Sequence, residues 1–402
     1  TGLYAMHKLC KEEKEYKILL IDERDYFGGR IYTNKMPQYE AGAARYNDNH
    51  KILLKLIEEY KLTNVKLEKR IDYLEKDSDD KIIIYKNIEK SFEETMKSII
   101  RESSKEKKEE LEKYTLREYI DKISKEEGLG EELVKIFGYY SEFERMNCKD
   151  SLRAFKSDFI SNNFYVMEEG LTELCVRIAE EGKKRKNVHI KQKMKILNIK
   201  EEGDKYKLEC DKGHEFKGRR VIIATKSEQL KQFKILKEIF PLLKEIYNAP
   251  LCRIYAVYPK KQGKVWFEGK PRMTTNSFLR QIIPIDYNKG IIMISYVDGE
   301  DINPYYKDVR KKELKSDKEI KNMIQKEVKT LFPRSEIPNP SYFKIHYWEV
   351  GVHHYKKGVD SIETYNKIKN PLKNIYVVGE AYSQKQAWME GGLETVEEVY
   401  KD

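Results

Sequence analysis

Short uninterrupted apolar runs mark the strands that we expect to be buried. Residues 18–21 (ILLI) and 375–378 (IYVV) are four apolar residues each, and residues 220–225 (RVIIAT) contain a similar run. Such runs are typical of strands covered on both faces, as in a parallel sheet. A segment with helical spacing, residues 2–14, precedes the first run. The pattern therefore predicts an α/β domain built around these three strands.

Other segments have the periodicity of elements that are buried on one side only. Residues 252–258 and 291–296 alternate as half-buried strands do, and residues 51–60 and 317–331 repeat apolar positions at helical spacing. Residues 89–135 are rich in Lys and Glu with periodic Ile, Leu and Tyr, which predicts surface helices. These segments therefore predict a second region of mixed helix and strand beside the α/β domain.

Composition and charge narrow the class of protein. A chain of 402 residues is long enough for two domains with a large core. Its residues are 40% hydrophobic and 36% charged, which predicts a globular protein with a very polar surface. No apolar run approaches ~18 residues, so we expect no membrane span. The net charge of +10 is spread over mixed Lys and Glu, and the basic cluster at 183–186 is short. We therefore expect a solvated surface and no nucleic-acid partner.

The cysteines stand singly along the chain, at Cys10, Cys148, Cys175, Cys210 and Cys252. No C-x-x-C pair or Cys/His spacing suggests a zinc site, so we expect no metal. A dispersed, odd number of cysteines suits a reducing compartment, which predicts a cytoplasmic location.

The first segment that carries chemistry follows the run at residues 18–21. Asp22 closes this strand, and Gly2 begins the preceding helix. In a dinucleotide-binding βαβ unit, a glycine lets the helix start close to a pyrophosphate, and an acid after the second strand binds ribose hydroxyls. A tight turn at Gly28-Gly29-Arg30 then delivers a fixed cation. The cofactor contacts predicted here are Gly2, Asp22, Glu23, Arg24, Gly29 and Arg30.

Residues 22–32 (DERDYFGGRIY) resemble the E-x-R-x-x-x-G-G-R-I segment of FAD-dependent amine oxidases of the monoamine, polyamine and L-amino-acid oxidase type. Asp22 stands where Glu is usual, a conservative change. The chain opens on Thr1 rather than Met. The resemblance then implies an N-terminally truncated chain, in which Gly2 is the third glycine of a G-x-G-x-x-G loop.

A second segment, residues 374–396 (NIYVVGEAYSQKQAWMEGGLETV), is similar to the terminal segment of the same family. The resemblance implies that Gly379 and Glu380 lie at the flavin. It also implies that a helix begins near Trp388 and points its N-terminus at the pyrimidine end of the flavin. The contacts implied for this segment are Gly379, Glu380, Ala387, Trp388, Met389 and Glu390.

Small residues at 40–45 (EAGAAR) let the backbone pass close to a flat ligand. In the family this segment runs beside the isoalloxazine ring, which implies contacts from Gly42, Ala43, Ala44 and Arg45. In amino-acid oxidases the arginine also binds the substrate carboxylate; the alternative for Arg45 is a surface ion pair. The resemblance further implies a backbone contact from Met194 to the adenine, and a cofactor contact from Trp348.

Three residues are the predicted catalytic set: Arg253, Trp388 and Tyr355. The resemblance places Trp388 and Tyr355 as two walls of an aromatic cage that orients an amine; the alternative for both is core packing. Arg253 stands where the family carries a Lys that holds a water near flavin N5, and an arginine cannot act as a base. Residues 282–284 lack the tyrosine that completes the carboxylate site of amino-acid oxidases.

The loop expected at residues 349–358 bears on how the flavin is held. It contains no Cys, so we expect non-covalent FAD. It does contain His353 and His354, which we expect to be polar surface residues rather than flavin attachment points.

The predicted fold is α/β, with a discontinuous three-layer Rossmann-like FAD-binding domain and an inserted α+β substrate-binding domain. The first comprises residues 1–50, 164–247 and 366–402. The second comprises residues 51–163, helical from about 89, and 248–365.

The implied reaction is oxidation of the C–N bond of an amine. Hydride passes to flavin N5, O2 reoxidises the flavin, and imine and H2O2 are released. Two alternatives stay open: a related flavoprotein oxidase, desaturase or isomerase with a non-amine substrate, and a catalytically degenerate FAD-binding protein. The expected partners are a small amine and O2. The sequence does not indicate the oligomeric state.

Overall fold

The computed structural model describes residues 1–12 and 16–400. Parallel strand pairs form its first part, which we call the parallel-strand region. β1 (Ile18–Ile21) pairs with β9 (Val188–Lys191), and β13 (Val221–Ile223) pairs with β21 (Ile375–Val377). The three apolar runs therefore form parallel strands, as predicted.

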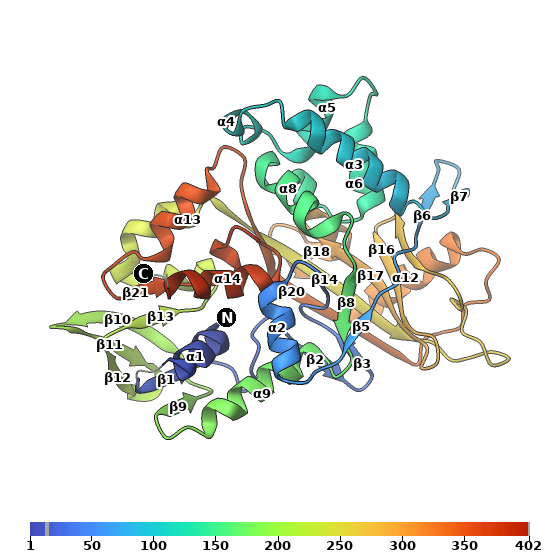
Figure 1. The fold of residues 1–402 in the computed structure, drawn as a ribbon. Helices are drawn as coiled ribbons and strands as arrows, with labels where there is room; N and C mark the ends of the chain where they lie inside the picture. Colours follow the sequence, from blue (N-terminus) through green and yellow to red (C-terminus); the bar gives the residue numbers. More distant parts are fainter. Residues whose placement is uncertain (13–15, 401–402) are drawn as a thin grey trace.

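Helices and a small sheet complete this region (Figure 1). The helices α1 (Gly2–Lys11), α9 (Leu171–Lys183) and α14 (Met389–Val399) share one hydrophobic core with β1 and β9. Residues 13 and 14 of the predicted first helix, and residues 401–402 of the predicted domain, lie outside the described residues. The antiparallel sheet is formed by β10 (Ile196–Glu202), β11 (Lys205–Cys210) and β12 (Glu215–Gly218).

A seven-stranded sheet forms the second part, with the order β20-β14-β17-β16-β15-β6-β7. All neighbours are antiparallel except β15 and β6. Helix α12 (Asp317–Leu331) begins with a capping box of Ser316 and Glu319 and packs on one face. The strands are β20 (Tyr342–Tyr355), β14 (Ile246–Val257), β17 (Ile291–Asp298), β16 (Gln281–Asp286), β15 (Arg272–Thr275), β6 (Ile71–Lys76) and β7 (Ile82–Tyr85).

The prediction of half-buried strands is wrong for β17, because all eight of its residues are buried. Ile292 and Ile294 pack in the core that contains α12. Met293 and Tyr296 point into a different cluster, which includes Tyr39 from the N-terminal part of the chain. The sheet is therefore covered on both faces, and its second face lies against the other half of the molecule.

A helical unit with its own core lies at the top of Figure 1. Phe143 and Phe155 are fully buried in it. The helices are α3 (Glu89–Ser103), α4 (Lys108–Leu111), α5 (Leu116–Ile123), α6 (Leu129–Phe137), α7 (Ser141–Glu144), α8 (Cys148–Ala154) and the π-helical turn η1 (Phe155–Phe159).

The predicted domain boundaries stay a prediction, but packing favours a shift of the first one. Helix α2 (Lys51–Glu59) packs in the core that contains α1 and α14. Strand β5 (Asn64–Lys66) then pairs with β8 (Phe164–Met167), which also pairs with β4 (Tyr46–Asn47). Residues 51–66 therefore pack with the parallel-strand region rather than with the large sheet.

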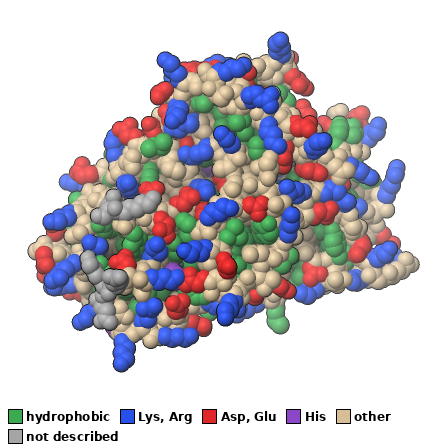
Figure 2. Space-filling model, in the orientation of Figure 1, with side chains coloured by type: hydrophobic (Ala, Val, Ile, Leu, Met, Phe, Trp, Pro, Cys, Tyr) green, Lys and Arg blue, Asp and Glu red, His purple; other side chains and the backbone are tan. Residues whose placement is uncertain are grey.

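The remaining elements are short connections. They are β2 (Thr33–Lys35), β3 (Gln38–Glu40), η2 (Asp211–Gly213), α10 (Ser227–Leu230), η3 (Lys234–Ile239), α11 (Phe240–Leu243), η4 (Gly299–Tyr305), β18 (Tyr306–Asp308), β19 (Glu313–Leu314), α13 (Ser361–Lys369) and η5 (Glu380–Tyr382). Among the described residues, no helix has both the length and the apolarity needed to cross a bilayer. Figure 2 shows acidic and basic side chains interspersed over the visible face.

Candidate functional site

One cavity of about 1110 Å³ lies between the parallel-strand region and the large sheet. Asp22, from the first predicted segment, and Glu380, from the second, both line it. The cavity is also lined by these other predicted site residues: Gly2, Glu23, Arg24, Gly29, Arg30, Gly42, Ala43, Ala44, Arg45, Met194, Arg253, Trp348, Gly379, Ala387, Trp388 and Met389. Two predicted residues, Tyr355 and Glu390, do not line it.

The carboxyl end of β1 carries the first group of polar contacts. Asp22 Oδ1 accepts the N–H of Arg24 at 2.9 Å, and the Asp22 carbonyl accepts the N–H of Met194 at 3.1 Å. Burial raises the pKa of Asp22 above its usual value. The Arg24 guanidinium donates to the Tyr26 hydroxyl and the Gly29 carbonyl. This end of the cavity therefore presents a fixed carboxylate on a rigid turn.

Glu380 is the centre of a fully paired charge network. Its Oε2 accepts from Arg30 Nη2 at 2.6 Å and from His353 Nδ1 at 2.7 Å. Its Oε1 accepts the backbone N–H of Ala387 at 2.7 Å and that of His353 at 3.1 Å. Burial alone would raise the pKa of Glu380, but the charge of Arg30 and the bonds from His353 and Ala387 lower it well below its usual value.

The histidines of this strand were expected at the surface, and that prediction is wrong. His353 and His354 are both buried. Their segment is not a loop, because β20 continues to Tyr355 and pairs with β14. His353 contacts Glu380 directly, which no local sequence signal indicated.

The small-residue segment forms a wall that leaves no space for a side chain at Gly42. A Cβ there would collide with the carbonyl oxygen of Arg30. The segment is held in place because the Arg253 guanidinium donates to the Gly42 carbonyl and, at 3.3 Å, to that of Glu40. Trp348 Nε1 donates to the Ala41 carbonyl at 2.9 Å. The backbone can therefore approach a flat ligand closely, as the small residues predicted.

Trp388 occupies the N-cap position of α14 and lines the cavity. Its ring packs edge-on against His50 at a centroid distance of 4.9 Å, and it is tilted against the Phe159 ring at a centroid distance of 5.5 Å. Its buried Nε1 has no hydrogen-bond partner. Trp388 thus combines the two interpretations, since its ring is part of the core and part of the cavity wall.

Glu390 serves the fold rather than the cavity. Its Oε1 and Oε2 accept the N–H groups of Ile52 and Leu53 at 2.8 and 3.0 Å. These are free donors in the first turn of α2. Glu390 therefore caps a neighbouring helix, and its expected contact with the cofactor is not supported.

Tyr355 also lies outside the cavity. Its side chain is 0% exposed, and its hydroxyl donates to the Tyr382 carbonyl at 2.8 Å. Its pairing with Ile246 places it at the far end of β20, behind the cavity wall. The expected second wall of an aromatic cage at Tyr355 is therefore wrong.

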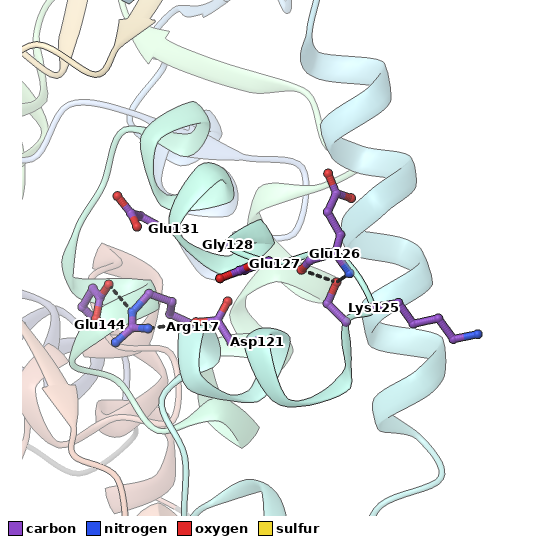
Figure 3. A pocket seen from close by; sticks show the side chains of 9 residues that line it. Arg117, Asp121, Lys125, Glu126, Glu127, Gly128, Glu131 and Glu144 are labelled. Carbon is purple, nitrogen blue, oxygen red and sulfur yellow. Dashed lines mark hydrogen bonds and ion pairs between the residues drawn. The ribbon is translucent and has the colours of Figure 1, made fainter. Parts of the chain in front are cut away.

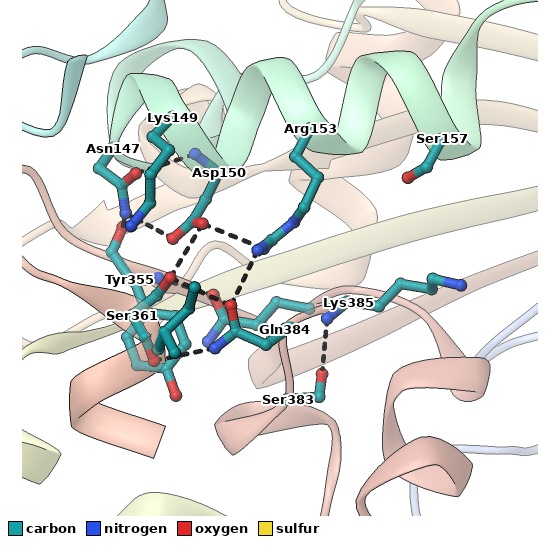
Figure 4. A network of polar contacts seen from close by, with 12 residues as sticks. Asn147, Lys149, Asp150, Arg153, Ser157, Tyr355, Ser361, Ser383, Gln384 and Lys385 are labelled. Atoms are coloured by element: carbon teal, nitrogen blue, oxygen red, sulfur yellow. Dashed lines mark hydrogen bonds and ion pairs between the residues drawn. The ribbon is translucent and has the colours of Figure 1, made fainter. Parts of the chain in front are cut away.

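A polar network surrounds Tyr355 and joins α8 to the segment that precedes α14 (Figure 4). Ser361 Oγ donates to Asp150 Oδ1 at 2.9 Å, and Arg153 Nη1 donates to Gln384 Oε1 at 2.8 Å. Gln384 Nε2 in turn donates to the Ser361 carbonyl at 2.8 Å. These bonds fix the chain that leads to Trp388.

The far end of the cavity combines two predicted residues, Arg45 and Arg253, with residues that sequence reasoning missed. We call it the arginine chamber; its polar lining comprises Arg45, Tyr139, Glu142, Arg253, Arg272, Tyr296 and Asp298. Arg253 Nη2 donates to the Tyr296 hydroxyl at 3.2 Å. Burial and the neighbouring Asp298 raise the pKa of Glu142 to about 8. Because these residues come from separate elements, no local motif could have grouped them.

A smaller pocket of about 650 Å³ lies over α5 and α6 (Figure 3). Its Arg117 pairs with Asp121 at 2.9 Å and with Glu144 at 2.6 Å. All its charged neighbours lie on helices of the helical unit or on the turn between them. These paired charges are typical of a solvated helix surface, and we assign the pocket no function.

The main cavity fits a flavin nucleotide. It offers a fixed carboxylate for hydroxyls at Asp22, and Arg30 at the Gly28-Gly29 turn. It also offers a backbone wall that only glycine permits at residue 42, and the uncapped N-terminus of α14. These are the donors and surfaces that a long, anionic, partly flat ligand needs.

Comparison with known proteins agrees with this fit. The sequence profile of the family described as "flavin containing amine oxidoreductase" matches residues 1–397. No curated protein matches significantly. Wild-type putrescine oxidase bound to putrescine superposes with a TM-score of 0.78 at 14% identity, covering 100% of this chain and 96% of that chain.

Two mutants from a redesign of cofactor binding in putrescine oxidase give similar results, with the same coverage. A triple mutant has a TM-score of 0.77 at 14% identity, and a double mutant has 0.75 at 13% identity. At such low identity these likenesses show the fold alone. Together with the profile match, which spans nearly the whole chain, they show that this chain belongs to the flavin-containing amine oxidoreductase family.

Proposed function

We propose that this protein is a FAD-dependent oxidase that oxidises the C–N bond of a small amine and passes the electrons to O2. One observation carries the proposal: segments 350 positions apart meet at one cavity, where Arg30 bonds to Glu380. Family membership supplies the flavin and amine oxidation in general. The substrate, the products and the form of the flavin belong to the proposal.

The proposed cofactor is FAD, held without a covalent bond. Asp22 would accept ribose hydroxyls, and Arg30 with the N-terminus of α14 would face the anionic and electron-rich parts. Residues 349–358 contain no Cys for a thioether. Cys175 lines the cavity, but burial raises the pKa of its thiol to about 11, so it stays protonated. The five free cysteines suit the proposed cytoplasmic location.

When bound, the flavin supplies the hydride acceptor and the reaction with O2. The protein chain positions the reactants and excludes water from the cavity. Trp388 and Trp348 line the cavity, and Arg253 fixes the small-residue wall by its bonds to Gly42 and Glu40. Arg253 stays protonated and cannot take a proton from the substrate. We therefore give Arg253 a positioning role rather than that of a base.

The test is an oxygen-consumption and peroxide assay of the FAD-loaded protein with monoamines, polyamines and amino acids. We expect at least one of these classes to give FAD-dependent peroxide in a 1:1 ratio with O2 consumed. Peroxide from a non-amine substrate alone would favour the flavoprotein alternative. Bound FAD that none of the compounds reduces under anaerobic conditions would favour a degenerate FAD-binding protein and overturn the proposal.

A further inference from the structure

Three buried or half-buried guanidinium groups share the arginine chamber without a carboxylate partner among the described residues. They belong to Arg45, Arg253 and Arg272, and all three line the cavity. Within the part of the chain that the structure describes, none of them forms an ion pair, although Arg30 at the other end does. Unpaired buried charge is costly, so a site that keeps it needs an explanation.

The three arginines are grouped by two tyrosine rings. The guanidinium carbons of Arg45 and Arg272 lie 5.5 and 5.7 Å from the centroid of the Tyr139 ring. The Tyr139 ring meets that of Tyr296 edge-on at 5.1 Å, and Arg253 lies 4.4 Å from the Tyr296 ring. Aromatic faces attract cations, so the rings hold the charges together without neutralising them.

The polar bonds of Arg272 leave part of its guanidinium free. Its Nη2 donates to Gln281 Oε1 at 2.6 Å, and its buried Nε has no partner. Burial lowers the pKa of Arg272 to about 10, so it still carries its charge near neutral pH. A buried cation with unused donors is the group to which an anion would bind bidentately.

The carboxyl groups in the chamber do not neutralise this charge. Asp298 accepts the N–H groups of Tyr140 and Ser141 at 2.8 and 2.9 Å, so its oxygens face the start of α7. Burial and the neighbouring Asp298 raise the pKa of Glu142, which favours its neutral form. The chamber therefore retains an excess of positive charge.

We infer that the substrate is an amine that also carries a carboxylate, and that Arg272 binds this carboxylate beside Arg45. The inference rests on the proposed function and names its substrate class. A diamine would bring a second cation among three unpaired guanidinium groups, which is unfavourable.

The experiment compares a carboxylate with its uncharged amide, using probes that cannot be oxidised as amines. Calorimetry on the FAD-loaded protein measures 3-phenylpropionate and 3-phenylpropanamide. We expect the carboxylate to bind at least about tenfold more tightly, because it accepts charge-assisted hydrogen bonds. Arg272→Gln should remove most of this preference, and Arg272→Lys should restore part of it. Arg219→Gln is the matched control, since the Arg219 side chain is 76% exposed.

Equal binding of the two probes to the wild type overturns the inference, even if the variants do not fold. An unchanged preference in folded Arg272→Gln overturns the assignment to Arg272. The outcome is independent of the proposed function, because a protein that prefers the carboxylate and oxidises no amine fails only the proposed function.

Discussion

The two ends of the cavity treat charge in opposite ways. At one end, Glu380 accepts hydrogen bonds from Arg30, His353 and the Ala387 N–H, so each charge has a partner before any ligand arrives. In the arginine chamber, Arg45 and Arg272 both lie over the Tyr139 ring and have no counter-ion among the described residues. Paired charges fix the geometry of a site, whereas unpaired charges remain able to bind a ligand of opposite charge.

The largest effect is expected from breaking the paired end. Glu380→Gln leaves Arg30 without a counter-ion and three donors with a weaker acceptor. We expect the free energy of unfolding to fall by about 3–5 kcal/mol and bound FAD to be lost. Denaturant titration and the flavin absorbance of the purified protein measure these effects. Glu363→Gln, which removes an exposed pair with Lys367, should change little. A stable, flavin-loaded Glu380→Gln protein would contradict the account.

The same carboxylate makes stability depend on pH in a known direction. The pKa of Glu380 is lowered in the folded state, so its contribution is complete above the unfolded carboxyl value of about 4.3. It is lost as the pH falls from there toward the folded value. We expect the wild type to lose stability more steeply than Glu380→Gln below about pH 4.3. Parallel acid-unfolding curves would show that Glu380 is not the group concerned.

Gly42→Ala tests the wall between the two ends. The added methyl group meets the Arg30 carbonyl, so the backbone must move, at a cost of about 1–3 kcal/mol. We expect FAD to bind at least about tenfold more weakly, which fluorescence titration measures. Gly203→Ala is the control, because Gly203 has a φ of +65° but open space around it. That variant should lose about 1–2 kcal/mol of stability and keep its FAD affinity. Equal FAD affinity in both variants would show that the backbone at Gly42 does not contact the cofactor.

Glu390→Ala separates the role of a helix cap from that of a cofactor contact. The N–H groups of Ile52 and Leu53 lose their acceptor, so we expect about 1–2 kcal/mol of destabilisation. The rate of flavin reduction should stay within about twofold of the wild-type rate, whereas the loss of a contact in the transition state would lower it much more. A large loss of reduction rate at unchanged stability would return Glu390 to the site.

The smallest effect is expected from Tyr355→Phe. It removes one buried hydrogen bond, to the Tyr382 carbonyl, and should cost about 1 kcal/mol. Because the ring does not line the cavity, kcat and KM should not change. Urea unfolding and steady-state kinetics check the two parts. A reduced kcat without a loss of stability would revive the aromatic cage at Tyr355.

The predictions from sequence succeeded where a function needs a local pattern. The strand at 18–21 with its acid, the Gly-Gly-Arg turn and the Gly379-Glu380 pair are short motifs, and Asp22 and Glu380 do line one cavity. Where a role depends on a distant partner, they failed. Glu390 accepts the N–H of Ile52, which lies 338 positions earlier in the chain, and β20 carries Tyr355 past the cavity by pairing with β14.

Apart from Arg45 and Arg253, the residues of the arginine chamber could not have been found from motifs. Arg272 on β15 and Tyr296 on β17 come together because both strands pair with β16. Glu142 on α7 joins them because Asp298 of β17 accepts the N–H groups of Tyr140 and Ser141. His353 and His354 are buried as well, which the local sequence did not indicate. These are non-local properties, which periodicity and spacing do not encode.

Anaerobic mixing of the FAD-loaded protein with one carboxylated amine and its amide, for example phenylalanine and phenylalaninamide, tests the contrast between the two ends most directly. The absorbance of the oxidised flavin reports the reaction. The account predicts that the flavin stays bound and that the carboxylated amine bleaches it at least about tenfold faster at subsaturating concentration. Faster bleaching by the amide, or a bound flavin that neither compound bleaches, would contradict it.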